Sequence, residues 1–275
     1  MHRLSWICII LFSWIFTANS QVNKEKQAVF DINYYPDSLQ TSQDIIAKCT
    51  LDVYYSELSK DNVTIIYIHG GWLKGGDKIE LPKELLDTGL NIVSVNYRLS
   101  PKVKAPLYIE DVAAAIAWTF KNVKDYGGDE EKIFLMGYSA GGYLASLVGL
   151  DKKWLSNYGI NTNQLAGLFI LSGQMVTHST IIEEMGYPDN KILIDEYAPL
   201  NHITNNAPPL ILFTGDRIMD IPGRYEENLF LKNMMEVSGH NYTKLFELQG
   251  YGHSNVVPAI PLIMNEVQSI INHEK

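Results

Sequence analysis

The chain has 275 residues, 46% of them hydrophobic, and a formal net charge of −9. Its acidic balance, without a cluster of lysine and arginine, excludes nucleic acid as the expected partner, because phosphates would not be neutralised. No repeat, low-complexity tract or flexible linker divides it, so we expect one domain large enough to bury a sizeable core.

The first twenty residues have the features of a secretory signal peptide. Arg3 supplies a positive charge, Leu4–Phe16 is almost wholly apolar, and small residues follow at the usual cleavage position. The apolar run is shorter than the roughly 20 residues that a membrane-spanning helix needs. We therefore expect residues 1–20 to be removed, leaving a secreted or periplasmic domain, residues 21–275, with no stable membrane span. An uncleaved anchor is the alternative.

The first strands lead to a glycine-rich loop. Residues 21–55 are expected to supply antiparallel edge strands, and the β-branched run 63–68 predicts a buried strand. This run is followed by His69-Gly70-Gly71-Trp72. Glycines let the backbone approach a substrate closely, so the N–H groups of Gly70 and Gly71 are candidate donors to an oxyanion. A simple turn is the plainer interpretation, and His69 is expected to brace the loop.

The middle of the chain contains a serine between glycines. Apolar runs at 91–97 and 133–136 predict strands, and helices are expected at 109–123 and 141–150. Between the second strand and the second helix lies Gly137-Tyr138-Ser139-Ala140-Gly141. A strand that turns sharply into a helix exposes the serine hydroxyl, and the helix N-terminus favours developing negative charge. Ser139 is therefore the candidate nucleophile, and the N–H of Ala140 is a third candidate oxyanion donor.

The second half continues the alternation of strands and helices. Strands are expected at 165–171, 210–213 and 242–248, and helices at 225–237 and 261–271. This order predicts an α/β fold whose central sheet is mostly parallel, with helices on both faces. The long irregular segment 172–206 is expected to act as a lid and to form part of the substrate pocket.

A serine nucleophile needs a base and an acid that orients the base. His253 lies on a glycine-rich loop directly after the last expected strand and is the candidate base, although a plain surface-loop histidine would look similar. The acid is expected after strand 210–213, where both Asp216 and Asp220 occur. We prefer Asp216, because it directly follows the strand, and keep Asp220 as the alternative.

These motifs together resemble the esterases and lipases of the α/β-hydrolase fold, near the hormone-sensitive-lipase group and the bacterial feruloyl and acetyl esterases. The resemblance covers most of residues 50–270. It departs from the family pattern at Trp72, which stands at the third-glycine position, and near Ile218, where the family's usual aspartate aligns. The resemblance implies hydrolysis of carboxylic esters through an acyl-enzyme, without a metal or cofactor.

We accordingly expect a serine carboxylesterase that acts on a small-molecule or carbohydrate ester, with acetyl or feruloyl groups as candidate acyl groups. The sequence leaves two alternatives open. One is an amidase related to arylformamidase, and the other is a hydrolase fold that has lost catalysis and serves for binding. No spacing of residues typical of a metal site is visible, and the sequence does not indicate an oligomeric state.

Overall fold

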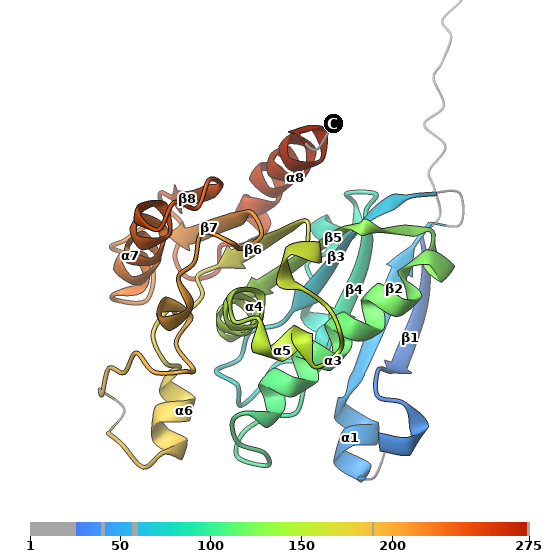
Figure 1. Ribbon diagram of the computed structural model, residues 1–275, viewed down its shortest axis with the longest axis horizontal. Helices are drawn as coiled ribbons and strands as arrows, with labels where there is room; N and C mark the ends of the chain where they lie inside the picture. Colours follow the sequence, from blue (N-terminus) through green and yellow to red (C-terminus); the bar gives the residue numbers. More distant parts are fainter. Residues whose placement is uncertain (1–25, 40–41, 57–59, 189, 274–275) are drawn as a thin grey trace, which may run out of the picture.

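The computed structural model describes residues 26–39, 42–56, 60–188 and 190–273. Its centre is an eight-stranded sheet with the strand order β1-β2-β4-β3-β5-β6-β7-β8 (Figure 1). β2 runs antiparallel to β1 and β4. The six strands β3, β4, β5, β6, β7 and β8 are parallel to one another. The strands are β1 (Gln27–Asn33), β2 (Thr50–Tyr55), β3 (Asn62–Ile68), β4 (Asn91–Val95), β5 (Gly128–Tyr138), β6 (Gly167–Leu171), β7 (Leu210–Gly215) and β8 (Thr243–Leu248).

The helices cover both faces of the sheet, as the alternation of elements predicts. α3, α4, α5 and α7 pack against one face, and α2 and α8 against the other. The longer helices are α3 (Leu107–Asn122), α4 (Ala140–Leu150), α7 (Arg224–Val237) and α8 (Val256–His273). The short ones are α1 (Gln43–Lys48), α2 (Lys83–Leu86), α5 (Lys153–Ser156) and α6 (Ser179–Glu184). Single 3₁₀ turns are η1 (Asp37–Leu39), η2 (Lys78–Glu80), η3 (Val123–Tyr126), η4 (Thr162–Gln164) and η5 (Pro199–His202).

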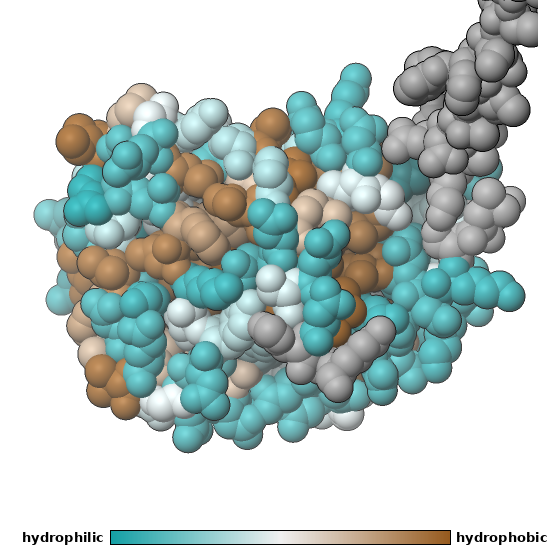
Figure 2. Space-filling view, turned by 90° about the horizontal axis from the view of Figure 1, so that it is seen from above, coloured by the Kyte–Doolittle hydropathy of each residue, from teal (hydrophilic) through white to brown (hydrophobic). Residues whose placement is uncertain are grey.

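The core lies on both sides of the central strands. β4, β6 and β7 are buried along their whole length, because each is covered on two faces, and this explains why their sequences are mostly apolar without a clean alternation. On the face under α2 and α8, the side chains of Phe246, Leu248 and Leu262 are only partly buried. Figure 2 shows apolar side chains reaching the surface on this side.

Most expected elements are confirmed, including the antiparallel edge formed by β1 and β2. Two elements begin earlier than expected: β5 begins at Gly128 and not at residue 133, and α8 begins at Val256 and not at residue 261. Pro261 therefore lies inside the helix, where a proline removes one hydrogen bond. Val256, Ala259 and Ile260 of the added part of α8 are buried in the core on the face of the sheet under α2 and α8. The segment 172–206 is mostly irregular and contains α6 and η5.

The topology brings four loops to one edge of the sheet. Because β3, β5, β7 and β8 are parallel, the loops that follow them all leave at the carboxyl ends of the strands. These loops carry the glycine-rich motif, the serine motif, both candidate acids and His253. In the part of the chain that the structure describes, no helix combines the length and apolar character needed to cross a bilayer.

Candidate active site

Ser139 stands at a sharp turn between β5 and α4. Its backbone has φ 55° and ψ −118°, a conformation that residues with side chains rarely adopt. The Ser139 N–H donates to the carbonyl of Leu171 at the end of β6, at 2.8 Å, which anchors the turn to the sheet. A Cβ atom on Gly141 would overlap the backbone carbonyl groups of Ile68 and His69, so only glycine fits there. The strained strand-turn-helix predicted from the serine motif is confirmed.

His253 contacts the serine from the loop after β8. Its Nε2 lies 2.8 Å from Ser139 Oγ, a hydrogen-bond distance. The imidazole is half-buried, and the ring of Tyr138 lies beside it with centroids 5.3 Å apart. Serine and histidine are 114 positions apart in the sequence, and the sheet topology brings them together.

The carboxylate beside the histidine belongs to Asp220, and our preference for Asp216 is wrong in this structure. Asp220 Oδ1 lies 2.7 Å from His253 Nδ1. Asp216 instead accepts hydrogen bonds from the N–H groups of Ile218 and Gly250, at 2.9 and 3.2 Å. The chain turns after β7, where the N–H of Asp220 donates to the carbonyl of Asp216, and this turn carries Asp220 back over the sheet edge. Asp216 therefore shapes the loop, and Asp220 faces the imidazole.

Asp220 is buried and held by donors on both of its oxygens. Oδ2 accepts from Ser172 Oγ at 2.7 Å and from the N–H of Gly215 at 2.8 Å, and Oδ1 also accepts from the N–H of Ile221. Burial alone raises the pKa of a carboxyl, but the hydrogen bonds from His253, Ser172 and the backbone outweigh it and hold the Asp220 pKa at about 2. The group is thus ionised at neutral pH and can stabilise an imidazolium.

This lowered pKa predicts a pH dependence of stability. An unfolded aspartate has a pKa of about 3.9, so the stabilisation by ionised Asp220 is present above about pH 4 and is lost as the pH falls towards 2. We expect the difference in the free energy of unfolding between the wild type and Asp220→Asn to shrink by about 2 kcal/mol between about pH 6 and about pH 2. Urea denaturation at both pH values measures this, and a difference independent of pH would contradict the assigned ionisation.

The candidate oxyanion donors adjoin the nucleophile. Gly70 lies so close to the turn between β5 and α4 that a Cβ atom on it would stand 3.2 Å from Ser139 Cβ. Gly71 has φ 108°, which favours glycine, and its carbonyl accepts from the N–H groups of Lys74 and Gly75. Ala140 is the first residue of α4, where an N–H has no partner inside the helix. The structure therefore places Gly70 and Ala140 beside Ser139, with Gly71 next along the same loop as Gly70.

His69 braces this loop. Its Nδ1 lies 2.7 Å from the carbonyl of Gly70, and its ring stacks on Tyr97 with centroids 4.5 Å apart. Burial lowers the pKa of His69 to about 4, so the ring is neutral at physiological pH. The contacts fit the structural part expected from the sequence.

The segment 172–206 contacts the glycine-rich loop through α6. Thr180 Oγ1 donates to the carbonyl of Trp72 at 2.5 Å, and Lys74 pairs with Glu183 at 2.5 Å. A cavity of about 670 Å³ opens between the two segments and is lined by Gly71, Trp72, Lys74, Gly75, Ser179, Thr180 and Glu183. The space next to one candidate oxyanion donor is thus enclosed in part by the expected lid.

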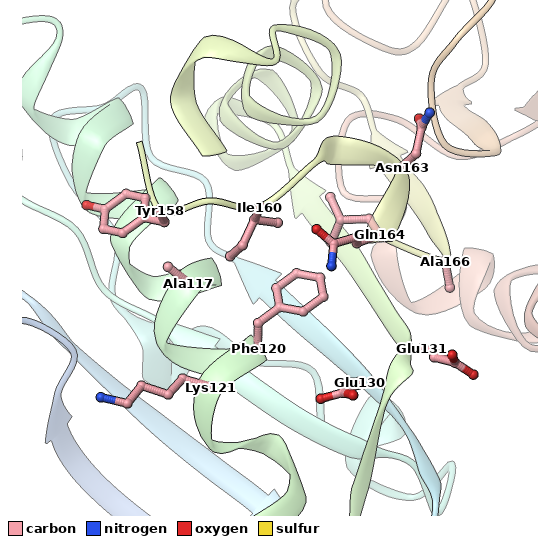
Figure 3. A pocket seen from close by; sticks show the side chains of 11 residues that line it. Ala117, Phe120, Lys121, Glu130, Glu131, Tyr158, Ile160, Asn163, Gln164 and Ala166 are labelled. Atoms are coloured by element: carbon pink, nitrogen blue, oxygen red, sulfur yellow. The ribbon is translucent and has the colours of Figure 1, made fainter. Parts of the chain in front are cut away.

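A second cavity, of about 920 Å³, lies away from this site. It is formed by α3, the beginning of β5 and the loop before β6, and Figure 3 shows Phe120, Ile160 and Gln164 gathered around it. Glu130 and Glu131, which also line it, are at the opposite end of β5 from Ser139. It therefore does not hold the reacting groups.

Two residues beside the acid have no signal in the sequence motifs. Ser172 follows β6 and donates to Asp220, and Asn255 Nδ2 donates to Ser172 Oγ at 2.6 Å. Ser172 directly follows β6, and Asn255 lies two positions after His253, directly before α8. Among the described residues, no three His, Cys, Asp or Glu side chains are grouped so that they could hold a metal ion.

Comparison with known proteins supports the resemblance to esterases that the sequence motifs indicate. A sequence model of the BD-FAE family matches residues 51–165. The chain is 28% identical to esterase LipC of Mycobacterium tuberculosis over 217 residues, which cover 71% of this chain and 53% of that protein. The chain spans about half the length of the curated relatives it matches.

Two solved structures share the architecture along most of their length. Inhibited esterase B from Lactobacillus rhamnosis has a TM-score of 0.72 at 20% identity and covers 94% of this chain and 91% of that one. A truncated carbohydrate esterase from gut microbiota has a TM-score of 0.69 at 19% identity, covering 88% and 96%. The chain has the α/β-hydrolase fold, and the resemblance to esterases of that fold that its motifs indicated is confirmed.

Proposed function

We propose that this protein is a serine carboxylesterase. The observation that supports it most is the continuous hydrogen-bonded series from Asp220 through His253 to Ser139, at 2.7 and 2.8 Å. A serine hydroxyl is a weak nucleophile until a base removes its proton, and this series supplies the base and its orienting acid. The similarity to esterases makes a carboxylic ester the favoured substrate over an amide.

The reaction follows from the positions of these groups. Ser139 Oγ attacks the ester carbonyl while His253 Nε2 takes its proton, and Asp220 stabilises the imidazolium. The N–H groups of Gly70, Gly71 and Ala140 receive the oxyanion of the tetrahedral intermediate. The imidazolium then protonates the departing alcohol, which leaves an acyl group on Ser139. Water, deprotonated by His253, releases the acid by the same steps.

For the substrate, we propose an acylated carbohydrate. The cavity beside Gly71 combines the Trp72 indole, which is 53% exposed, with the charged groups of Lys74 and Glu183 and the hydroxyl of Ser179. An aromatic face suits the apolar face of a sugar ring, and charged and hydroxyl groups suit its hydroxyls. A carbohydrate esterase is among the proteins that share this fold.

This assignment predicts that Trp72 matters for sugar esters and not for simple ones. Trp72→Ala is expected to raise KM for an acetylated xylo-oligosaccharide by about 10-fold, because the stacking surface is lost. With p-nitrophenyl acetate, which offers no sugar ring, KM should change by less than about 2-fold. Steady-state kinetics on both substrates measure this. Ile79→Ala, another exposed apolar residue after the same loop, is the matched control. Equal effects of Trp72→Ala on both substrates would exclude the cavity as the sugar subsite.

The function as a whole is tested with a substrate panel. We expect the wild-type protein to hydrolyse p-nitrophenyl acetate and acetylated or feruloylated oligosaccharides faster than a formylated aromatic amine. Preference for the formylated amine would replace the esterase by an amidase. Failure on every member, with an intact fold, would favour a hydrolase fold that serves for binding.

A further inference from the structure

Ser172 occupies an unusual position at the centre of the site. It is the first residue after β6, has φ 47° and is completely buried. Its N–H donates to the carbonyl of Phe213 in β7 at 2.7 Å. The preceding carbonyl, that of Leu171, accepts from Ser139. One short stretch of backbone therefore fixes both the nucleophile and a hydroxyl that touches the acid.

The hydrogen bonds around this hydroxyl have a defined direction. Ionised Asp220 can only accept, so the Ser172 O–H, 2.7 Å away, must donate to it. That leaves only lone pairs of Ser172 Oγ for Asn255, whose Nδ2 lies 2.6 Å away and donates. The series therefore runs in one direction, from the Asn255 amide through Ser172 to the acid.

We propose that Ser172 and Asn255 are positioning residues that orient the carboxylate of Asp220 towards His253, with Asn255 fixing the direction in which the Ser172 hydroxyl donates. The inference rests on the proposed function. It concerns no contact with substrate, because both side chains are fully buried. Their effect reaches the reaction through Asp220.

The geometry explains how this orientation would work. Ser172 and Gly215 hold Oδ2, which leaves Oδ1 directed at His253. Without the Ser172 hydroxyl, Oδ2 keeps one backbone donor and the carboxylate can rotate. The backbone N–H of Asn255 also donates to the carbonyl of His253, at 2.9 Å. Asn255 therefore links the loop of the base to the support of the acid.

The experiment compares variants that remove or reverse this series. Ser172→Ala is expected to lower kcat on p-nitrophenyl acetate by about 10- to 100-fold, with KM within about 2-fold. The acid-side midpoint of the kcat/KM profile should rise by about half a pH unit, because a carboxylate with fewer donors attracts the imidazolium proton more strongly. Arg224, which also interacts electrostatically with Asp220, is unchanged in every variant.

Asn255→Asp and Asn255→Ala distinguish the direction of the hydrogen bond to Ser172 from the space that the Asn255 side chain fills. The aspartate has the same shape but can only accept, so it competes with Asp220 for the Ser172 proton, and we expect it to lose more activity than the alanine variant. Ser94→Ala is the matched control, because Ser94 is also fully buried and its hydroxyl donates to a backbone carbonyl, that of Lys78, and not to Asp220. It should keep the wild-type kcat and pH profile.

The outcomes distinguish this inference from the proposed function. If the wild type hydrolyses the ester and Ser172→Ala matches Ser94→Ala in kcat and pH profile, the positioning role is wrong. If Asn255→Asp does not fold, Ser172→Ala and Asn255→Ala still decide the matter. If the wild type hydrolyses no ester, the proposed function fails. The rate at which a fluorophosphonate modifies Ser139 then provides the same comparison, because it reports activation of the serine without an ester substrate.

Discussion

Ser139→Ala is expected to lower kcat on p-nitrophenyl acetate by about 10⁴- to 10⁶-fold while the protein stays folded. The reason is that the Ser139 hydroxyl lies 2.8 Å from His253 Nε2, where the base can take its proton. Among the described residues, no other hydroxyl makes a hydrogen bond to this nitrogen. The residual rate would come from binding and from the oxyanion donors. Steady-state kinetics, with circular dichroism to verify folding, measure the effect.

A second serine, in the helix that follows Ser139, is the control for the general effect of removing a serine hydroxyl. Ser146 lies in α4, is fully buried, and its Oγ donates to the carbonyl of Gly142 at 2.8 Å. Ser146→Ala should therefore keep kcat within a few-fold of the wild type, with at most a modest loss of stability. Near-wild-type turnover by Ser139→Ala would show that another group attacks the ester.

The second large effect is expected at the acid. Asp220→Asn should lower kcat by about 10⁴-fold with little change in KM. An asparagine can donate its amide N–H to His253 Nδ1, and this favours the tautomer whose proton sits on Nε2. That proton would point at Ser139 Oγ, so the imidazole could no longer accept the hydroxyl proton. The pH dependence of kcat and the structure of the variant check this account.

Asp216→Asn is the matched control for this prediction. Asp216 lies in the same loop, four positions earlier, but its oxygens accept from backbone N–H groups and do not face His253. An asparagine keeps one accepting oxygen, so we expect kcat to fall by no more than a few-fold. A large loss in Asp216→Asn together with a small one in Asp220→Asn would reverse the assignment of the acid.

The fold and two of the three triad residues could be predicted because their signals are local. Continuous apolar runs identify strands buried on both faces, and their alternation with helices fixes the parallel topology. Ser139 lies in a five-residue motif whose glycines are required by backbone contacts. His253 was found because a loop at the carboxyl end of a parallel strand reaches the same edge as the serine.

The acid could not be chosen from sequence alone because its position depends on the shape of one turn. Asp216 and Asp220 lie four positions apart. The turn between them, closed by hydrogen bonds from the N–H groups of Met219 and Asp220 to the carbonyl of Asp216, places the Asp220 side chain against His253. Ser172 and Asn255 were missed for a related reason. Their importance comes from contacts between positions 48 and 83 residues apart, which no local pattern contains.

The most direct test of the account is the site of covalent modification by a fluorophosphonate, located by mass spectrometry of the intact and digested protein. We expect one adduct, on the peptide that contains Ser139, with modification abolished in Ser139→Ala and strongly slowed in His253→Ala. An adduct on a different residue, or equal rates in the wild type and His253→Ala, would contradict the proposal that His253 activates Ser139 as the nucleophile.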